Sequence, residues 1–170
     1  KKRKNSKAKI IAVTGSSGKT TLKTLLGNSL TNYGKTFFSK MSHNNYLGVP
    51  LSLSNLENDH QYGVFEVGMS KPGEIQKLSN IIKPDIAVIT NIGEAHIENF
   101  DNLNGIAKAK SEIIENINKN GFLILNKDDK YFDYLSKIAK KKKIKVLSFG
   151  VTKKSDAYLI KHKIYKNHNL

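Results

Sequence analysis

Apolar and polar residues follow two kinds of pattern along the chain. Short runs rich in Ile, Val and Phe predict buried strands, and stretches with apolar residues three or four positions apart predict helices. The predicted strands are residues 10–13, 35–40, 62–68, 85–90, 121–126 and 145–150, and the predicted helices are 19–33, 50–56, 73–82, 104–117 and 128–142. Strands that alternate with helices indicate an α/β fold with a doubly wound, mostly parallel sheet.

Polar loops follow four of the predicted strands. The loops are Gly15–Thr21, Met41–Gly48, Glu66–Ser70 and Asn91–Phe100. In a parallel sheet, ligands bind at the carboxyl ends of the strands, where such loops gather. We therefore expect the functional site among these loops. After Gly150 the pattern weakens, and residues 156–170 alternate like the first strand of a further unit.

The first of these loops has the pattern of a phosphate-binding loop. The segment VTGSSGKTT matches G-x-x-x-x-G-K-[ST] except that Val13 replaces the first glycine. Backbone N–H groups near Ser16 to Lys19 are predicted to surround phosphates, aided by the N-terminus of the next helix. Lys19 is expected to reach the β- and γ-phosphates, and Thr20 to bind Mg²⁺. The alternative is a strand–turn–helix that merely requires glycines.

Two further candidates lie in the loops after later strands. Glu66 ends an apolar strand, and its carboxylate is expected at the same edge of the sheet, where it could bind Mg²⁺ through oxygen. The alternative is an ordinary charge at a strand end. His96 follows the next strand, although a lone histidine is more often structural than a ligand.

Lys110 stands out for its place on a predicted helix. Ile106, Ile113 and Ile117 form one apolar stripe, and Lys110 lies near that stripe, while Lys108 and Glu112 point away from it. A lysine on the inward side needs an anionic partner or a changed charge. The alternative is a stem that follows the apolar surface and leaves its ammonium in water.

Composition narrows the classes of protein. The 170 residues suffice for one domain, and no apolar run approaches the roughly 20 residues of a membrane helix. There is no cysteine, which excludes disulfides and thiolate metal sites and favours a cytoplasmic protein. The net charge is +15, yet only one of the 29 basic residues is arginine, the usual reader of guanine edges. A positive field would still attract an anionic nucleotide.

Two rival classes remain to be weighed. A GTPase is suggested by Asn126-Lys127-x-Asp129, which resembles the guanine-reading N-K-x-D. Against it, the first glycine of the phosphate loop is absent, no D-x-x-G lies between that loop and Asn126, and no S-A-K-like motif follows residue 150. Asp128 and Asp129 are instead expected to cap the next helix. A nucleic-acid-binding module is disfavoured because the aromatic residues fall on predicted strands, as core residues do.

Taken together, these residues resemble the Mur ligase family of ATP-dependent amide-bond-forming enzymes. The resemblance rests on VTGSSGKTT, NNYLGVPLSL, FEVGMSKPGEIQKLSNIIKPDIAVITNIGEAHIENF and GIAKAKSEI, in the expected order from Ile10 to about Ile114. The NNxxGVP segment and the run from GEI to AH resemble the member that adds D-alanyl-D-alanine to a UDP-N-acetylmuramoyl-tripeptide, rather than its sister ligases or folylpolyglutamate synthase. The family's phosphate loop also lacks the early glycine.

The resemblance implies a role for each candidate. It implies that ATP is bound by Gly15, Ser16, Ser17, Gly18, Lys19, Thr20 and Thr21, with Asn44 and Asn45 near the reacting groups. Two Mg²⁺ ions are implied, one held by Thr20 and Glu66 and one by His96 and a carbamylated Lys110. Lys19, Lys110 and His96 are the implied catalytic residues. The γ-phosphate would pass to the tripeptide carboxylate, and the amine of D-alanyl-D-alanine would attack the acyl phosphate.

The resemblance also implies a domain organisation. The family protein has three domains, so residues 1–9 are expected to be a basic linker from a missing N-terminal domain. Residues 10–170 are expected to be the ATP-binding central domain, incomplete at its C-terminal end. We expect this fragment alone to be inactive. We further expect a cytoplasmic monomer without a nucleic-acid partner or membrane insertion.

Overall fold

The computed structural model describes residues 2–39, 41–95, 97–162, 164–165 and 168–169. A seven-stranded sheet runs through the molecule in the order β2-β3-β1-β4-β5-β6-β7, and every neighbouring pair is parallel. Its strands are β1 (Lys9–Thr14), β2 (Thr36–Phe38), β3 (Tyr62–Glu66), β4 (Ile86–Ile89), β5 (Phe122–Asn126), β6 (Lys145–Gly150) and β7 (Ala157–Tyr158). The predicted α/β fold with a parallel sheet is confirmed.

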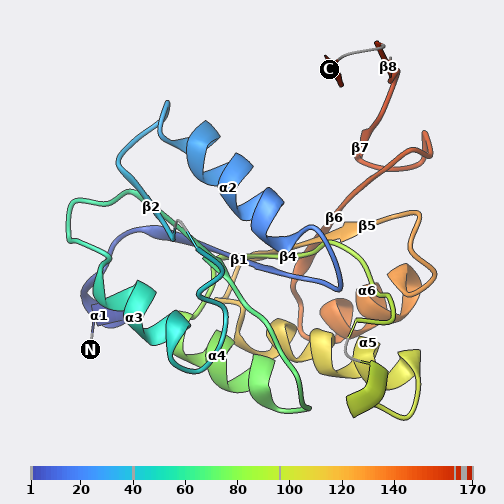
Figure 1. Ribbon diagram of the computed structural model, residues 1–170, viewed down its shortest axis with the longest axis horizontal. Coiled ribbons are helices and arrows are strands. Elements are labelled where there is room, and N and C mark those ends of the chain that lie inside the picture. Colours follow the sequence, from blue (N-terminus) through green and yellow to red (C-terminus); the bar gives the residue numbers. More distant parts are fainter. Residues whose placement is uncertain (1, 40, 96, 163, 166–167, 170) are drawn as a thin grey trace.

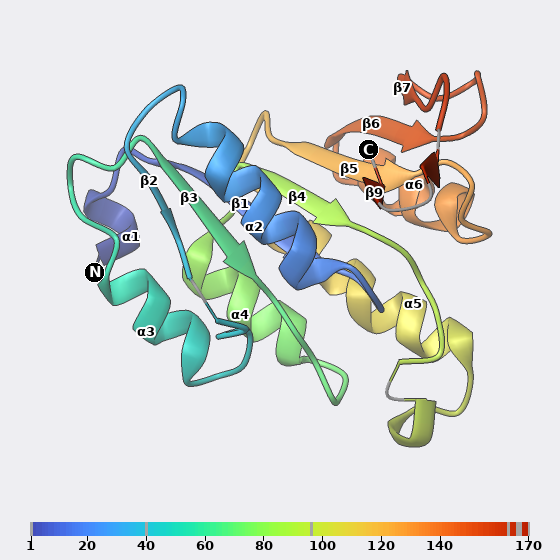
Figure 2. The same cartoon turned by 45° about the horizontal axis from the view of Figure 1, so that its top comes forward.

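Helices cover the two faces of the sheet unequally. The helices are α1 (Lys2–Asn5), α2 (Lys19–Leu30), α3 (Gly48–Ser54), α4 (Glu74–Ile82), α5 (Leu103–Ser111) and α6 (Phe132–Lys141), with 3₁₀ turns η1 (Ile97–Asn99) and η2 (Glu112–Asn116). One face carries α2, and the other carries α3 to α6 (Figure 1, Figure 2). The larger apolar core lies under the four helices. Beyond the sheet, β8 (Ile164–Tyr165) and β9 (His168–Asn169) form an antiparallel pair.

The order of the strands brings three of the predicted loops together. β1 lies between β3 and β4, and Val13 stands opposite both Glu66 and Val88. The chain leaves β1 through α2 toward β3 and returns to β4 on the other side of β1. Such a reversal opens a crevice at the carboxyl ends of the strands. The loops that follow β1, β3 and β4 therefore meet at one edge.

The structure corrects three details of the predicted helices. The helix expected over 104–117 is α-helical only to Ser111 and continues as η2, which turns Glu112 toward the N-terminus of α4, where it accepts from the Gly73 N–H at 2.7 Å. The helix expected from Asp128 begins at Phe132. The spacing of Leu22, Leu25, Leu26 and Leu30 predicts Leu25 on the apolar side of α2, yet Leu25 is 60% exposed. In each case contacts with neighbouring elements outweigh the local pattern.

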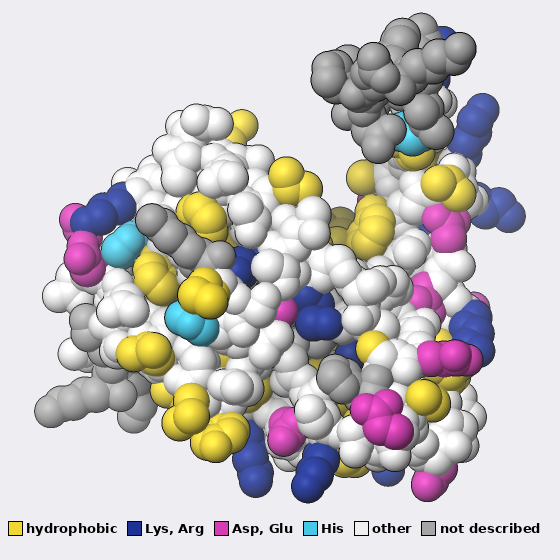
Figure 3. Space-filling view, viewed as in Figure 1, with side chains coloured by type: hydrophobic (Ala, Val, Ile, Leu, Met, Phe, Trp, Pro, Cys, Tyr) yellow, Lys and Arg dark blue, Asp and Glu magenta, His cyan; other side chains and the backbone are white. Residues whose placement is uncertain are grey.

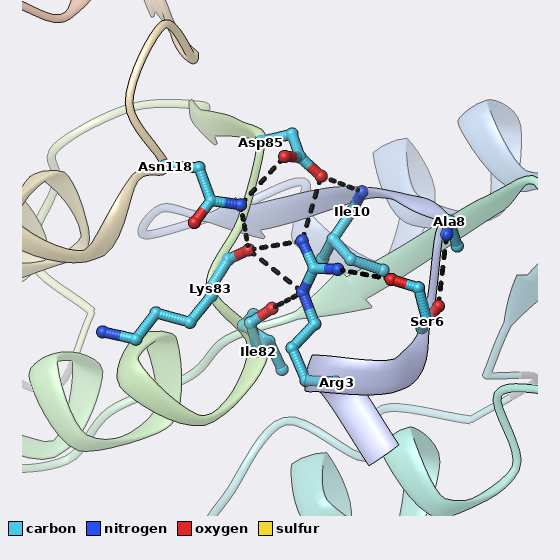
Figure 4. A network of polar contacts seen from close by, with 8 residues as sticks. All are labelled: Arg3, Ser6, Ala8, Ile10, Ile82, Lys83, Asp85 and Asn118. Atoms are coloured by element: carbon cyan, nitrogen blue, oxygen red, sulfur yellow. Dashed lines mark hydrogen bonds and ion pairs between the residues drawn. The ribbon is translucent and has the colours of Figure 1, made fainter. Parts of the chain in front are cut away.

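The N-terminal segment is attached to the sheet through Arg3 (Figure 4). Its Nε donates to the carbonyl of Ile82 at 2.7 Å, where a cation suits the C-terminal end of α4. Its Nη2 binds Asp85 Oδ2 at 3.1 Å, and Asn118 donates to the other oxygen of that carboxylate. Residues 3–9 therefore have a defined place against the domain. That 1–9 is a linker from a preceding domain stays a prediction.

Nucleic-acid binding depends on the charges at the surface, and membrane crossing depends on the lengths of the helices. On the face drawn in Figure 3, lysine side chains are interspersed with Asp and Glu rather than gathered in one basic patch. Nucleic-acid binding calls for a clustered basic surface, so that face gives the alternative no support. Among the described residues, none of the helices has the length and apolar character that crossing a membrane requires.

Candidate active site

The loop after β1 turns on two glycines. Gly15 has φ +147°, and a Cβ at this position would lie 1.8 Å from Oγ1 of Thr90, the residue that follows β4. Gly18 has φ +76° and forms the N-cap of α2. Val13 is fully buried and still belongs to β1. The turn therefore begins at Gly15, which explains why the first glycine of the general pattern is not needed at position 13.

Asn91 organises the N–H groups of this loop. Its Oδ1 accepts from the backbone N–H of Ser16 at 3.1 Å and of Ser17 at 2.9 Å, and its Nδ2 donates to Ser17 Oγ at 2.6 Å. On the preceding residue, Thr90 Oγ1 donates to the Ser17 carbonyl at 2.6 Å. Successive N–H groups that converge on one oxygen form a concavity suited to an anion. The sequence placed Asn91 in a site loop without assigning it this role.

Lys19 lies at the first turn of α2 and folds back over the loop. Its Nζ donates to the carbonyls of Gly15 at 2.9 Å and Ser16 at 3.3 Å. Burial lowers the pKa of Lys19, and the nearby Glu66 carboxylate opposes that shift. The ammonium is thus close to the loop N–H groups that would face a phosphate. The sequence predicted that Lys19 reaches the β- and γ-phosphates, and this role stays a prediction.

Glu66 brings three elements together. It is 2% exposed at the end of β3. Its Oε2 accepts from Thr20 Oγ1 on α2, and its Oε1 accepts from Asn44 Nδ2, both at 2.8 Å. Ser42 Oγ lies 3.0 Å from the Thr20 hydroxyl. A Cβ at Gly68 would lie 2.9 Å from Asn44 Cγ, so glycine there leaves room for Asn44 to reach the carboxylate.

The Thr20 and Glu66 oxygens have the spacing that Mg²⁺ requires. Adjacent oxygen ligands of an octahedral Mg²⁺ ion lie about 2.9 Å apart, since each ligand is about 2.1 Å from the ion. Thr20 Oγ1 and Glu66 Oε2 are 2.8 Å apart. Both are hard oxygen donors of the kind that this ion prefers. The pair therefore fits a divalent cation. His96, predicted for a second ion, lies outside the described residues.

Lys110 is buried in the interior, as the helical pattern predicted. It is 2% exposed and lies between the buried Ile106 and Ile113, whereas Lys108 is exposed. Burial and, to a smaller extent, the charge of Lys19 lower the pKa of Lys110 to about 7. Among the described residues, no hydrogen-bond acceptor is recorded for its amine. Near neutral pH the amine is therefore neutral in about half of the molecules.

Lys19, Asn44 and Lys110 line one cavity of about 210 Å³. It is lined by Gly15, Lys19, Asn44, Gly68, Met69, Ser70, Glu74 and Lys110. Asn45 does not join this group: it is exposed, and its Oδ1 accepts from the backbone of Leu47 and Gly48 at the start of α3. Thr21 is exposed on α2. A cavity of about 400 Å³ beside α2 is lined by apolar residues and does not suit a charged phosphate.

Lys23 is a buried residue of this site that sequence reasoning missed. It is 0% exposed on α2, one turn beyond Lys19. Its Nζ donates to the Met41 carbonyl at 2.9 Å and lies 4.0 Å from Glu66 Oε2. The spacing of four residues from Lys19 puts the two lysines on one side of a helix. That spacing was the available signal, but nothing local showed that this side is buried.

The residues of the GTPase-like motif are occupied in other ways. Asp129 Oδ2 accepts from the Ile92 N–H at 2.7 Å, and its Oδ1 accepts from the Tyr131 N–H at 2.8 Å. Lys127 Nζ lies 3.7 Å from the centre of the Phe132 ring. The carboxylate that would read guanine therefore fixes two loops to each other. The N-cap of α6 is Tyr131, so the predicted capping by Asp128 and Asp129 was wrong.

Comparisons with known proteins agree with this geometry. Residues 13–170 match the model of the Mur ligase middle domain. A UDP-N-acetylmuramoyl-tripeptide–D-alanyl-D-alanine ligase of Rickettsia prowazekii (strain Madrid E) is 44% identical over 163 residues, which are 95% of this chain and 36% of that protein. The chain thus spans about a third of the length of the curated relatives it matches.

Solved structures give the same result. The crystal structure I of MurF from Acinetobacter baumannii superposes with a TM-score of 0.89 at 38% identity, over 95% of this chain and 35% of that one. The MurF ligase of Thermotoga maritima in complex with ADP gives 0.84 at 34% identity, over 97% of this chain and 38% of that one. Fold and sequence therefore agree, and the chain belongs to the Mur ligase family, matching its middle domain.

Proposed function

We propose that the full-length protein containing this chain is an ATP-dependent ligase of peptidoglycan precursor synthesis. It would join the carboxylate of a UDP-N-acetylmuramoyl-tripeptide to the amine of D-alanyl-D-alanine. The observation that carries the proposal is the convergence of Lys19, Glu66 and Lys110 beside one phosphate-binding loop. Relatives with this name at 44% identity favour this reaction over that of folylpolyglutamate synthase. A cytoplasmic location, which the sequence predicted, is part of this proposal.

The phosphate loop and Lys19 would bind the nucleotide. Residues Gly15 to Thr21 would surround the phosphates, and the N–H groups of Ser16 and Ser17 already converge on an oxygen acceptor. The Lys19 ammonium would leave its own loop carbonyls for the β- and γ-phosphates. Phosphoryl transfer brings a phosphate and a carboxylate together, and these repel each other. Fixed positive charge at Lys19 lowers that barrier.

Two Mg²⁺ ions are proposed beside the nucleotide. Thr20 and Glu66 would hold the first, and Asn44 would keep the Glu66 carboxylate oriented through its hydrogen bond. His96 and Lys110 would hold the second. When bound, the ions neutralise phosphate charge and stabilise the charge that develops in transfer. Asn45 and Thr21 stay near this site on the resemblance alone.

Lys110 would serve as a carbamate. Its neutral amine attacks CO₂, forms an N–C bond and releases one proton, which turns a potential cation into an anion. The lowered pKa favours this step because only the neutral amine has a free electron pair. A protonated Lys110 would instead repel both Lys19 and a metal ion. Carbamylation would therefore explain why the Lys110 amine is buried although no hydrogen-bond acceptor is described for it.

The proposed reaction balances in two steps. A tripeptide carboxylate oxygen attacks the γ-phosphorus, and ADP leaves with an acyl phosphate remaining. The amine of D-alanyl-D-alanine then attacks the acyl carbon, phosphate leaves, and one proton is lost from nitrogen. The chain's side chains supply orientation and charge in both steps, and His96 is proposed as the third catalytic residue with Lys19 and Lys110.

Ligation by the full-length protein tests the proposal. ATP, the UDP-linked tripeptide and D-alanyl-D-alanine are combined, and the product is identified by mass spectrometry while ADP is quantified. We expect product and ADP in equal amounts, and none when any component is omitted. Replacing ATP by GTP tests the GTPase alternative, and folate with glutamate tests the sister activity. Nucleotide hydrolysis at the same rate with and without D-alanyl-D-alanine, and without ligated product, would refute the proposal.

A further inference from the structure

Lys23 is a buried cation that the proposed reaction does not use. Its exposed fraction is 0%, and it lies one helical turn beyond Lys19 on α2. A lysine is almost never fully buried unless its charge is paired, because loss of hydration is costly. The groups around its ammonium therefore indicate why this side of the helix carries a charge.

Among the described residues, the recorded partners of the Lys23 ammonium are acceptors. Nζ donates to the Met41 carbonyl at 2.9 Å and to Ser39 Oγ at 3.3 Å. The Ser39 hydroxyl gives its own hydrogen to the same Met41 carbonyl, at 2.8 Å, so its lone pairs remain for Lys23. Glu66 Oε2 lies 4.0 Å from Nζ, and the Glu66 side chain is 1% exposed. Burial has the larger effect and lowers the pKa of Lys23, although the Glu66 carboxylate favours the charged form of the amine.

The carboxylate oxygen beside Lys23 is also the one proposed to bind metal. Glu66 Oε2 accepts from Thr20 at 2.8 Å, in the spacing that fits Mg²⁺. Its partner oxygen is already occupied by Asn44. Lys23 and the first metal ion would therefore both interact with the same oxygen, Glu66 Oε2. Two cations so placed repel each other, and burial of the Glu66 carboxylate strengthens that repulsion.

We infer that Lys23 is a resident counter-ion of Glu66, a positioning residue that holds this carboxylate and the chain at Met41 in place without metal. The inference rests on the proposed metal site at Thr20 and Glu66. Its consequence is weak binding of a divalent ion to the empty site, because Lys23 already supplies positive charge. The negative phosphates of a nucleotide would offset the repulsion, so metal and nucleotide bind together.

The test measures Mn²⁺ binding to the full-length protein without nucleotide, from the electron paramagnetic resonance of the free ion. Lys23→Met removes the charge, and Lys23→Gln also removes it but keeps a donor for the Met41 carbonyl. We expect both variants to bind Mn²⁺ at least tenfold more tightly than the parent. In a Glu66→Gln background the gain should vanish. Lys108→Met is the matched control, since Lys108 is exposed on α5.

The outcomes separate the inference from the proposed function. Unchanged or weaker Mn²⁺ binding in both Lys23 variants would overturn the inference alone, provided that the parent binds Mn²⁺ together with ATP. A parent that binds no metal–nucleotide complex would overturn the proposed function and the inference with it. If the variants unfold without metal, refolding on addition of Mn²⁺ supports the inference, because the ion then replaces the ammonium, and failure to refold overturns it.

Discussion

Replacement of Lys110 by alanine is the sharpest test of the proposed chemistry. A pKa of about 7, against 10.5 for an ordinary lysine, leaves about half of the amine neutral at pH 7 rather than about one part in three thousand. The difference corresponds to about 5 kcal/mol of preference for the neutral form. This is the fraction available to react with CO₂. The buried position of Lys110 therefore prepares it for carbamylation near neutral pH.

The loss of activity follows from the charge that the carbamate would supply. At about 5 Å and an effective dielectric constant of about 20, one pair of unit charges is worth roughly 3 kcal/mol. Loss of that attraction lowers the rate by at least roughly two orders of magnitude. We expect Lys110→Ala in the full-length enzyme to be nearly inactive and to recover partly with added short carboxylic acids. Lys108→Ala, on the exposed side of α5, should remain close to normal.

The assay combines ligation rate with direct detection of the carbamate. Parent enzyme in CO₂-depleted buffer should lose activity and regain it with bicarbonate, and ¹³C-labelled bicarbonate should give a carbamate resonance that Lys110→Ala lacks. Equal losses at Lys108 and Lys110 would refute the argument from burial. Full activity of Lys110→Ala would refute the carbamate hypothesis. So would a parent enzyme whose activity does not depend on bicarbonate.

The remaining predictions concern the loop, the metal and the pH. Lys19→Ala should abolish ligation with an unchanged circular dichroism spectrum, and retained ATP turnover would exclude its phosphate role. Glu66→Ala should raise the Mg²⁺ concentration for half-maximal activity at least tenfold. An unchanged Mg²⁺ dependence would indicate that Glu66 is only structural. Gly15→Ala should cost at least about 2 kcal/mol in urea unfolding, because of its positive φ and the contact with Thr90. In CO₂-free buffer, stability relative to Lys110→Met should rise between pH 7 and 10, because the unfolded chain then binds a proton that the folded chain lacks. A flat difference would contradict burial of the free amine.

The sequence by itself determined the elements and the main side chains of the site. The apolar runs gave the strands of a parallel sheet, and the glycines with Lys19 and Thr20 marked the loop after β1. The phase of Ile106 and Ile113 placed Lys110 inward. These features could be predicted because they depend on neighbours within a few residues, where helical and extended periodicities act.

Only the tertiary structure decided which groups meet across the sheet. Lys23 reads as an ordinary helix lysine until β2 and β3 enclose it, and Asn91 reads as a loop residue until β4 pairs with β1. Asp129 was expected to cap α6. Its side chain instead joins the loop before α6 to the loop after β4. Such contacts depend on strand order and register between segments tens of residues apart. Local patterns carry no information on them, because the free energy that selects each partner arises only when those segments pack.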